Sequence, residues 1–237
     1  MPPPWLTIIA WISLAAGFLT AGVIAFDIYG RRLRQPMRVM EAVWPITALF
    51  LGPLGWFAYA RLGRPRVTKS SGHSEEAQLA EWQGVAVSAT HCGAGCALGD
   101  IIGEWVVFAA VLTIAGATIW PEYLIDFALA FVFGIAFQYF AIKPMSETLS
   151  RREALARAIQ ADTFSIVAFE LGMFGWMALV YYVLFTHPRL TTDHAAYWLM
   201  MQIAMAIGLA TAYPASVWLI RRGVKEPMER PVLTAHR

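Results

Sequence analysis

The sequence has few charged residues and only two cysteines. Asp, Glu, Lys and Arg make up 14% of its 237 residues, whereas an ordinary soluble domain has about 25%. This deficit excludes a typical soluble domain, and the net charge of +2 is too small to indicate nucleic acid as a partner. The cysteines, Cys92 and Cys96, are too few for a disulfide framework. Four residues apart on a helix, their β-carbons are also too distant for good disulfide geometry.

Motifs of several enzyme classes are also missing. The sequence contains no glycine-rich phosphate loop, no HExxH, no CxxCH for covalent haem and no nucleophile elbow. Its CxxxC spacing differs from the CxxC of thioredoxin-type enzymes. We therefore expect a binding or transport protein rather than an enzyme.

Long apolar runs make up most of the chain. Hydrophobic residues account for 58% of it, and about 20 apolar residues are enough to cross a bilayer. The runs occupy residues 5–29, 44–59, 85–120, 123–142, 164–185 and 195–220. The first run is followed by arginines rather than a small-residue cleavage site, so we expect a retained helix instead of a signal peptide. The sequence predicts an all-α, polytopic transmembrane bundle of five or six helices, in which residues 1–237 form one integral membrane domain in the lipid bilayer.

The number of spans depends on the short run 44–59, which Gly52-Pro53 interrupts. Cytoplasmic loops are enriched in Lys and Arg, which places the polar linker 61–84 and the basic tail 221–237 in the cytoplasm. Six complete spans would then put the arginines of 31–38 outside, whereas a re-entrant 44–59 leaves five spans and an external N-terminus. The aromatic residues at both ends of 44–59 are typical of a membrane interface and favour the sixth span.

The third run opens with HCGAGCALGDIIGE, residues 91–104. Its glycines recur every four residues, a pattern that lets another helix approach closely. The stripe consists of Gly95, Gly99 and Gly103. It predicts a helix-packing face, within the chain or in a homo-oligomer. Because 36 residues exceed one simple span, the run forms either one long helix or a helix broken near residues 93–95.

Thiols and carboxylates lie beside this stripe. Cys92, Cys96 and Asp100 follow each other at i, i+4, and Glu104 continues the row. Acids at membrane depth are costly and mark functional sites by default. The alternative is a packing seam in which the cysteines serve as small apolar residues.

Further polar and soft side chains occur in the later runs. Asp126 and Glu170 lie within apolar segments, whereas Asp27 and Asp162 lie near helix ends, where they are either solvated or functional. Methionines recur at helical spacing beside Glu170 and in the last run. They are Met173, Met177, Met201 and Met205. Thioether, thiolate and imidazole together select Cu(I) over harder ions, although methionine is also a common filler of apolar interfaces.

We therefore expect the protein to bind a soft transition-metal ion, with Cu(I) the first choice, and transport across the membrane is the further step of this hypothesis. The expected metal ligands are His91, Cys92, Cys96, Met173, Met177, Met201 and Met205. Proton and charge balance would come from Asp100, Glu104, Asp126 and Glu170, because ligation of a cation displaces protons. His91 points about 100° away from Cys92 on a regular helix and joins the site only if the backbone turns there.

Three alternatives remain open from the residues alone. The first is a membrane thiol oxidoreductase that uses Cys92 and Cys96, which would require the GAG stretch to unwind. The second is a proton or ion pathway built on Asp100, Glu104, Asp126 and Glu170, with the cysteines only packing. The third is an assembly factor whose glycine stripe binds a partner helix.

Several blocks of the sequence resemble a bacterial membrane-protein family, the domain-of-unknown-function family numbered 4396. The blocks are THCGAGCALGDIIGEW (90–105), DFALAFVFGIAFQYFAIKPM (126–145), ADTFSIVAFELGMFGWM (161–177) and MMQIAMAIGLATAYPASVWLIRRGVKEPM (200–228). The earlier blocks FDIYGRR (26–32) and MRVMEAVWPITALFLGPLGWFAYARLG (37–63) also fit, so the resemblance extends over nearly the whole chain. The resemblance implies a multi-helix domain in the bacterial inner (plasma) membrane, and it implies no established activity or catalytic residues. The family pattern has Pro-Asn in the last helix, where this chain has Pro214-Ala215.

Overall fold

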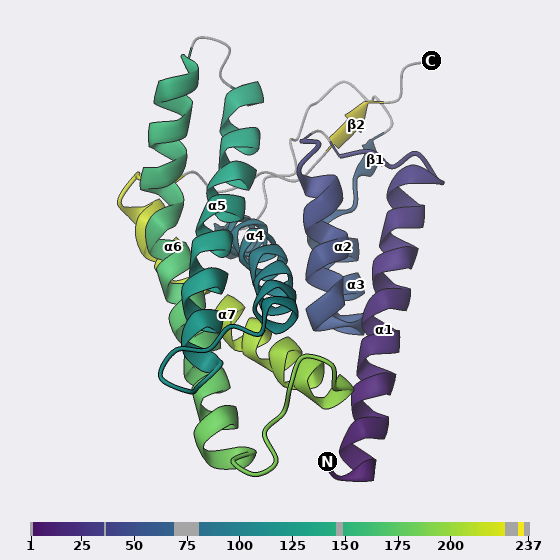
Figure 1. The fold of residues 1–237 in the computed structure, drawn as a ribbon. Coiled ribbons are helices and arrows are strands. Elements are labelled where there is room, and N and C mark those ends of the chain that lie inside the picture. Colours follow the sequence, from purple (N-terminus) through teal and green to yellow (C-terminus); the bar gives the residue numbers. More distant parts are fainter. Residues whose placement is uncertain (1, 36, 69–80, 146–148, 226–231, 235–237) are drawn as a thin grey trace.

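Helices make up most of the described chain (Figure 1). The computed structural model describes residues 2–35, 37–68, 81–145, 149–225 and 232–234. Its elements are α1 (Pro4–Tyr29), α2 (Met40–Leu51), α3 (Pro53–Ala58), the π-helical turn η1 (Tyr59–Gly63), β1 (Arg66–Thr68), α4 (Glu81–Ala110), α5 (Ile119–Met145), α6 (Arg151–Leu179), the π-helical turn η2 (Val180–Leu184), α7 (Ala195–Arg221) and β2 (Val232–Thr234). The two short strands pair in parallel and are the only sheet among these residues. Half of the linker 61–84 and just over half of the tail 221–237 lie outside the described residues.

Five helices are long and apolar enough to cross a membrane. They are α1, α4, α5, α7 and α6 continued by η2. The prediction of a polytopic helical membrane protein is therefore confirmed. On α1, large apolar side chains such as Trp11 and Phe18 are 63% and 67% exposed, as expected for a helix that faces lipid.

The run 44–59 turns back on itself, so the expected sixth span is wrong and the re-entrant alternative is correct. α2 ends before Gly52, whose φ of +55° is a conformation that favours glycine, and α3 begins directly at Pro53. The backbone of Ala48 lies where a Cβ on Gly55 would project. The aromatic residues that suggested an interface are core residues instead, because Trp44 and Tyr59 are fully buried and their ring centroids are 5.7 Å apart.

Buried polar groups attach this hairpin to the neighbouring helices. Asp27 near the end of α1 accepts hydrogen bonds from Arg64 at 2.9 and 3.0 Å and from the Tyr59 hydroxyl at 3.0 Å. Gln202 of α7 donates to the carbonyl of Leu49 at 2.6 Å. Asp27 is therefore not solvated but holds the hairpin against α1.

The run 85–120 forms one continuous helix followed by a loop. α4 shows no break near residues 93–95 and ends at Ala110, so the long-helix alternative is correct for this part. The expectation that the run reaches residue 120 is wrong, because residues 111–118 form a turn before α5. Val111 and Ala115 have φ of +51°, and Gly116 has φ of +74°.

The connections divide between two ends of the bundle (Figure 1). At the upper end in this view lie the end of α1, the end of α5 and the start of α6, and α7 runs toward this end. We call it the basic end because residues 31–38, 61–66, 143–152 and 221–225 carry its Lys and Arg. At the opposite end, the connections 111–118 and 185–194 contain a single basic residue, Arg189.

Candidate functional site

α4 and α5 pack through the glycine stripe. A Cβ on Gly95 would lie 2.7 Å from the Cα of Gly134, and Gly99 lies directly against the backbone of Ala130. Gly103 lies against the Asp126 side chain. The stripe is thus an internal seam that brings the polar row of α4 next to α5. It leaves no room for a partner helix, so a homo-oligomer stays a prediction that would need another surface.

The two thiols lie in the centre of the bundle. Cys92 and Cys96 are free, fully buried and adjacent to each other. They belong to one core cluster with four predicted thioether ligands. These are Met173, Met177, Met201 and Met205. Because α4 remains helical through both cysteines, the unwinding that a thiol oxidoreductase requires is not seen.

His91 is buried on α4, and its ring centroid lies 6.0 Å from that of Phe137 of α5. Neither ring nitrogen has a hydrogen-bond partner among the described residues. Within the same part of the chain, no group of three or more His, Cys, Asp and Glu side chains is placed to hold a metal ion. A soft-metal site would therefore depend on the two thiols and on thioethers of the same core cluster, and it stays a prediction.

Four carboxyl groups continue from the thiols toward the end opposite the basic end. Glu170 of α6 lies beside Cys96, and Asp100 interacts with both Glu170 and Glu104. Asp126 of α5 lies beside Glu104. We call these four residues the acid column, and each is at most 2% exposed.

The acid column lacks internal partners for much of its hydrogen-bonding capacity. Both oxygens of Asp100 have no hydrogen-bond partner among the described residues, nor do one oxygen of Glu104 and one of Asp126. Among the same residues, Glu170 has only the Cys96 thiol as a hydrogen-bonding neighbour. The ion pairs found in this part of the chain include none of the four. A buried, unpaired carboxylate is very costly. Each group must therefore hold a proton, a water molecule or a cation.

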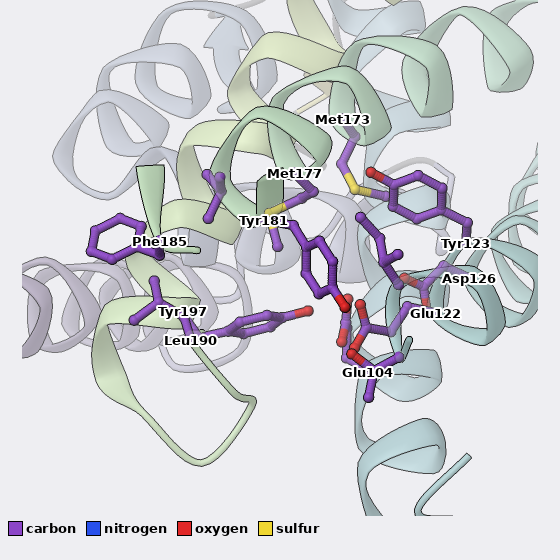
Figure 2. Close-up of a pocket in the computed structure, with 13 residues that line it drawn as sticks. Glu104, Glu122, Tyr123, Asp126, Met173, Met177, Tyr181, Phe185, Leu190 and Tyr197 are labelled. Carbon is purple, nitrogen blue, oxygen red and sulfur yellow. The ribbon is translucent and has the colours of Figure 1, made fainter. Parts of the chain in front are cut away.

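The column ends in a small cavity at the end opposite the basic end (Figure 2). Its volume is about 20 Å³, and its walls include Glu104, Asp126 and a third acid, Glu122. The hydroxyl groups of Tyr181 and Tyr197 point toward these carboxyls in Figure 2. The Tyr197 hydroxyl lies beside Glu104, whereas the Tyr181 hydroxyl has no hydrogen-bond partner among the described residues. Met173 and Met177 also line the cavity.

The thiols and the acid column together form a polar line through the bundle. A buried ion pair lies at the end of this polar line that is opposite the cavity. Lys225, just after α7, donates to Asp162 of α6, and both side chains are fully buried. Burial lowers the pKa of Lys225, but the Asp162 carboxylate more than offsets this, so the pKa lies above its usual value and the side chain is an ammonium. Asp162 is therefore paired rather than solvated.

Sequence reasoning did not identify the residues at the two ends of the line. Lys225 follows the last apolar run among other basic residues, which resemble topology signals. Glu122 lies between the apolar runs 85–120 and 123–142, and Tyr181 and Tyr197 carry no motif. The signal that could have been used is the position of Glu122 four residues before Asp126, which puts both acids on one face of a helix.

A family model described as "Domain of unknown function (DUF4396)" matches residues 81–225, which is more than half of the chain. The chain belongs to the DUF4396 family. The matched part begins with α4 and ends at Lys225, so it contains the thiols, the acid column and the ion pair. The match is shorter than the expected resemblance over nearly the whole chain, because α1 and the hairpin lie outside it. No curated protein and no solved structure matches this DUF4396 protein.

Proposed function

We propose that this DUF4396 protein conducts protons through the acid column. The observation that carries the proposal is the succession of four buried carboxyls between the thiols and the cavity, several of whose oxygens have no hydrogen-bond partner among the described residues. A carboxyl group both accepts and releases a proton, and chains of intramembrane acids form the proton relays of pumps and transporters. A purely structural set of buried acids would be expected to be paired.

The dimensions support a proton rather than a larger substrate. From Cys92 to Glu104, the line follows α4 for about 18 Å, a large part of a hydrocarbon core that is about 30 Å thick. The cavity of about 20 Å³ has room for about one water molecule. Water there would connect Glu104 to Glu122 and to the opposite end of the bundle.

The distribution of basic residues supports an orientation. By the positive-inside rule, the basic end faces the cytoplasm and the cavity faces outward. Five spans then place the N-terminus outside and the C-terminus inside, and the arginines of 31–38 no longer contradict the rule. We propose that the protein lies in this orientation in a bacterial inner (plasma) membrane.

The test is proton flux into proteoliposomes that contain the purified full chain and a pH-sensitive dye. A potassium diffusion potential drives the flux. We expect flux in the wild type and at least a tenfold loss in Glu170→Gln, which keeps the shape of the side chain but cannot ionise. Asp193→Asn is the matched control, because Asp193 is an exposed acid outside the column. Wild-type flux in Glu170→Gln, or none in the wild type, would refute the proposal.

Soft-metal binding is a second candidate, favoured by the burial of two free thiols in one cluster with methionines. Two thiolates and one or two thioethers suit Cu(I), and Glu170 beside Cys96 would accept a proton that ligation releases. Elemental analysis of protein purified under reducing conditions tests this candidate. Near-stoichiometric copper that is lost in the Cys92→Ser/Cys96→Ser double variant would support it, and equal trace metal in both would exclude it. That double variant retains proton flux if the acid column alone conducts.

A further inference from the structure

The turn after α7 directs a lysine into the bundle. α7 ends at Arg221, and Gly223 adopts φ of +69°. The amide of Gly223 donates to the carbonyl of Ile220 at 2.9 Å, and that of Val224 donates to Leu219 at 3.0 Å. Such a cap reverses the chain at a glycine with positive φ. The reversal turns Lys225 away from solvent, and the residue is 3% exposed.

The ammonium group of Lys225 pairs with a carboxylate that lies well inside α6. Asp162 is eleven residues into that helix, about 16 Å along its axis from the first residue. Among the ion pairs of the described residues, this is the only one in which both side chains are fully buried. A buried pair contributes little net stability, because desolvation of both charges offsets their attraction. Its presence at this position therefore calls for another explanation.

The pair lies where the polar line begins at the basic end. The charge of Lys225 acts on Cys92, Cys96 and His91. The second oxygen of Asp162 is buried and has no hydrogen-bond partner among the described residues. The Asp162 carboxylate thus faces the polar interior with one oxygen bound to an ammonium and the other without a partner.

We propose that Asp162 forms a monovalent-cation site at the basic end of the acid column, and that the Lys225 ammonium is its built-in occupant. A lysine ammonium is a compact point charge on a flexible stem. The Lys225 amide donates to the carbonyl of Leu219 in α7 at 3.4 Å, so it is the flexible side chain that withdraws, while the backbone of the cap stays in place. Small monovalent cations of similar charge and size, with ammonium the closest match, then fill the same place.

The role of this site rests on the proposed function. With Lys225 in place, a fixed positive charge stands between the column and the basic end and opposes the passage of another cation. When Lys225 withdraws, Asp162 becomes the next acid in line after the thiols. The site itself requires only the ion pair and the surrounding polar groups.

The experiment is chemical rescue of Lys225→Ala, measured as the melting temperature of the purified full chain in detergent. Ammonium chloride is compared with choline chloride at equal ionic strength, since choline is too large for the vacated space. We expect Lys225→Ala to melt below the wild type in choline, and ammonium to restore at least half of the difference. Asp162→Asn/Lys225→Ala should not respond to ammonium, because the carboxylate that binds the cation is gone.

The outcomes are decisive in each arm. Equal melting of Lys225→Ala in the two salts would overturn the proposal, and so would an equal ammonium response in the double variant. If Lys225→Ala cannot be purified folded in choline, the preparation is repeated in ammonium throughout. Folded protein in ammonium alone supports the site, and none in either salt overturns it. Melting is measured without a proton gradient, so failure of the cation site and failure of proton flux are separate results.

Discussion

Replacement of Gly95 by alanine tests the internal seam between α4 and α5. The added Cβ would lie 2.7 Å from the Cα of Gly134, whereas ordinary van der Waals contact begins at 3.4 Å. The two helices would have to separate by at least about 0.7 Å there, the difference between these distances. The neighbouring atoms belong to the backbone, so no side chain can rotate to relieve the contact. Overpacking of this kind costs about 1–3 kcal/mol.

The matched control is Gly175→Ala on α6, where no atom lies within 4 Å of the added Cβ. Both substitutions gain the same helix propensity, about 0.5–1 kcal/mol relative to glycine. The difference between the two variants therefore isolates the overpacking cost of about 1–3 kcal/mol at Gly95. Denaturation of both variants in mixed micelles measures it as a difference in unfolding free energy. If the two variants are equally stable, α4 and α5 are not packed as described, and the acid column built on that contact is not assembled.

Two further predictions follow from particular residues. Gly52→Ala should lower the unfolding free energy by about 1–2 kcal/mol, because φ of +55° strains any residue with a Cβ, while no other atom lies near the added Cβ. The control is Gly22→Ala on α1, where the added Cβ also meets no atom. A comparable loss of stability in Gly22→Ala would contradict this reasoning. Lys225→Ala should increase the rate at which a small maleimide labels the two thiols by at least tenfold in choline chloride, as read by mass spectrometry. Arg221→Ala, at an exposed position beside the same turn, should leave the rate unchanged, and equal rates in the two variants would show that Lys225 does not limit access.

The fold was predictable where composition alone decides it. A run of about 20 apolar residues has few alternatives to a membrane helix, because its backbone groups must be satisfied within the segment. The hairpin was harder to predict, since Trp44 and Tyr59 look like interface anchors but are core residues. The boundary between α4 and α5 was hidden because the loop 111–118 is itself largely apolar. Hydropathy shows which residues avoid water. It does not distinguish an apolar turn, buried or facing the membrane, from an apolar helix.

The candidate site was predictable along one helix but not between helices. Cys92, Cys96 and Asp100 share a face because their spacing is fixed by the helical repeat. Glu170 stood out as an acid at membrane depth, but its contact with Cys96 depends on how α6 packs against α4. Lys225 could not be recognised, because a cap that reverses the chain after α7 places it inside, and its sequence neighbours are exposed basic residues.

The extent of the family match separates the bundle into two parts, a matched part that contains the candidate site and an unmatched part formed by α1 and the hairpin. The matched residues, 81–225, contain every acid of the column and both members of the buried ion pair. α1 instead presents large apolar side chains outward, and the hairpin is held by Asp27 and Arg64, which lie outside the column. Substitutions that loosen the hairpin should therefore reduce the unfolding free energy and leave the proposed proton flux of the folded protein unchanged. Replacement of Glu170 by Gln or of Asp100 by Asn should instead reduce proton flux and leave the unfolding free energy nearly unchanged, since a neutral side chain of the same shape preserves packing and removes an ionisable group. Proton flux and unfolding free energy measured on the same variants would separate the two parts, and a hairpin variant that is stable yet inactive would place part of the pathway outside α4–α7.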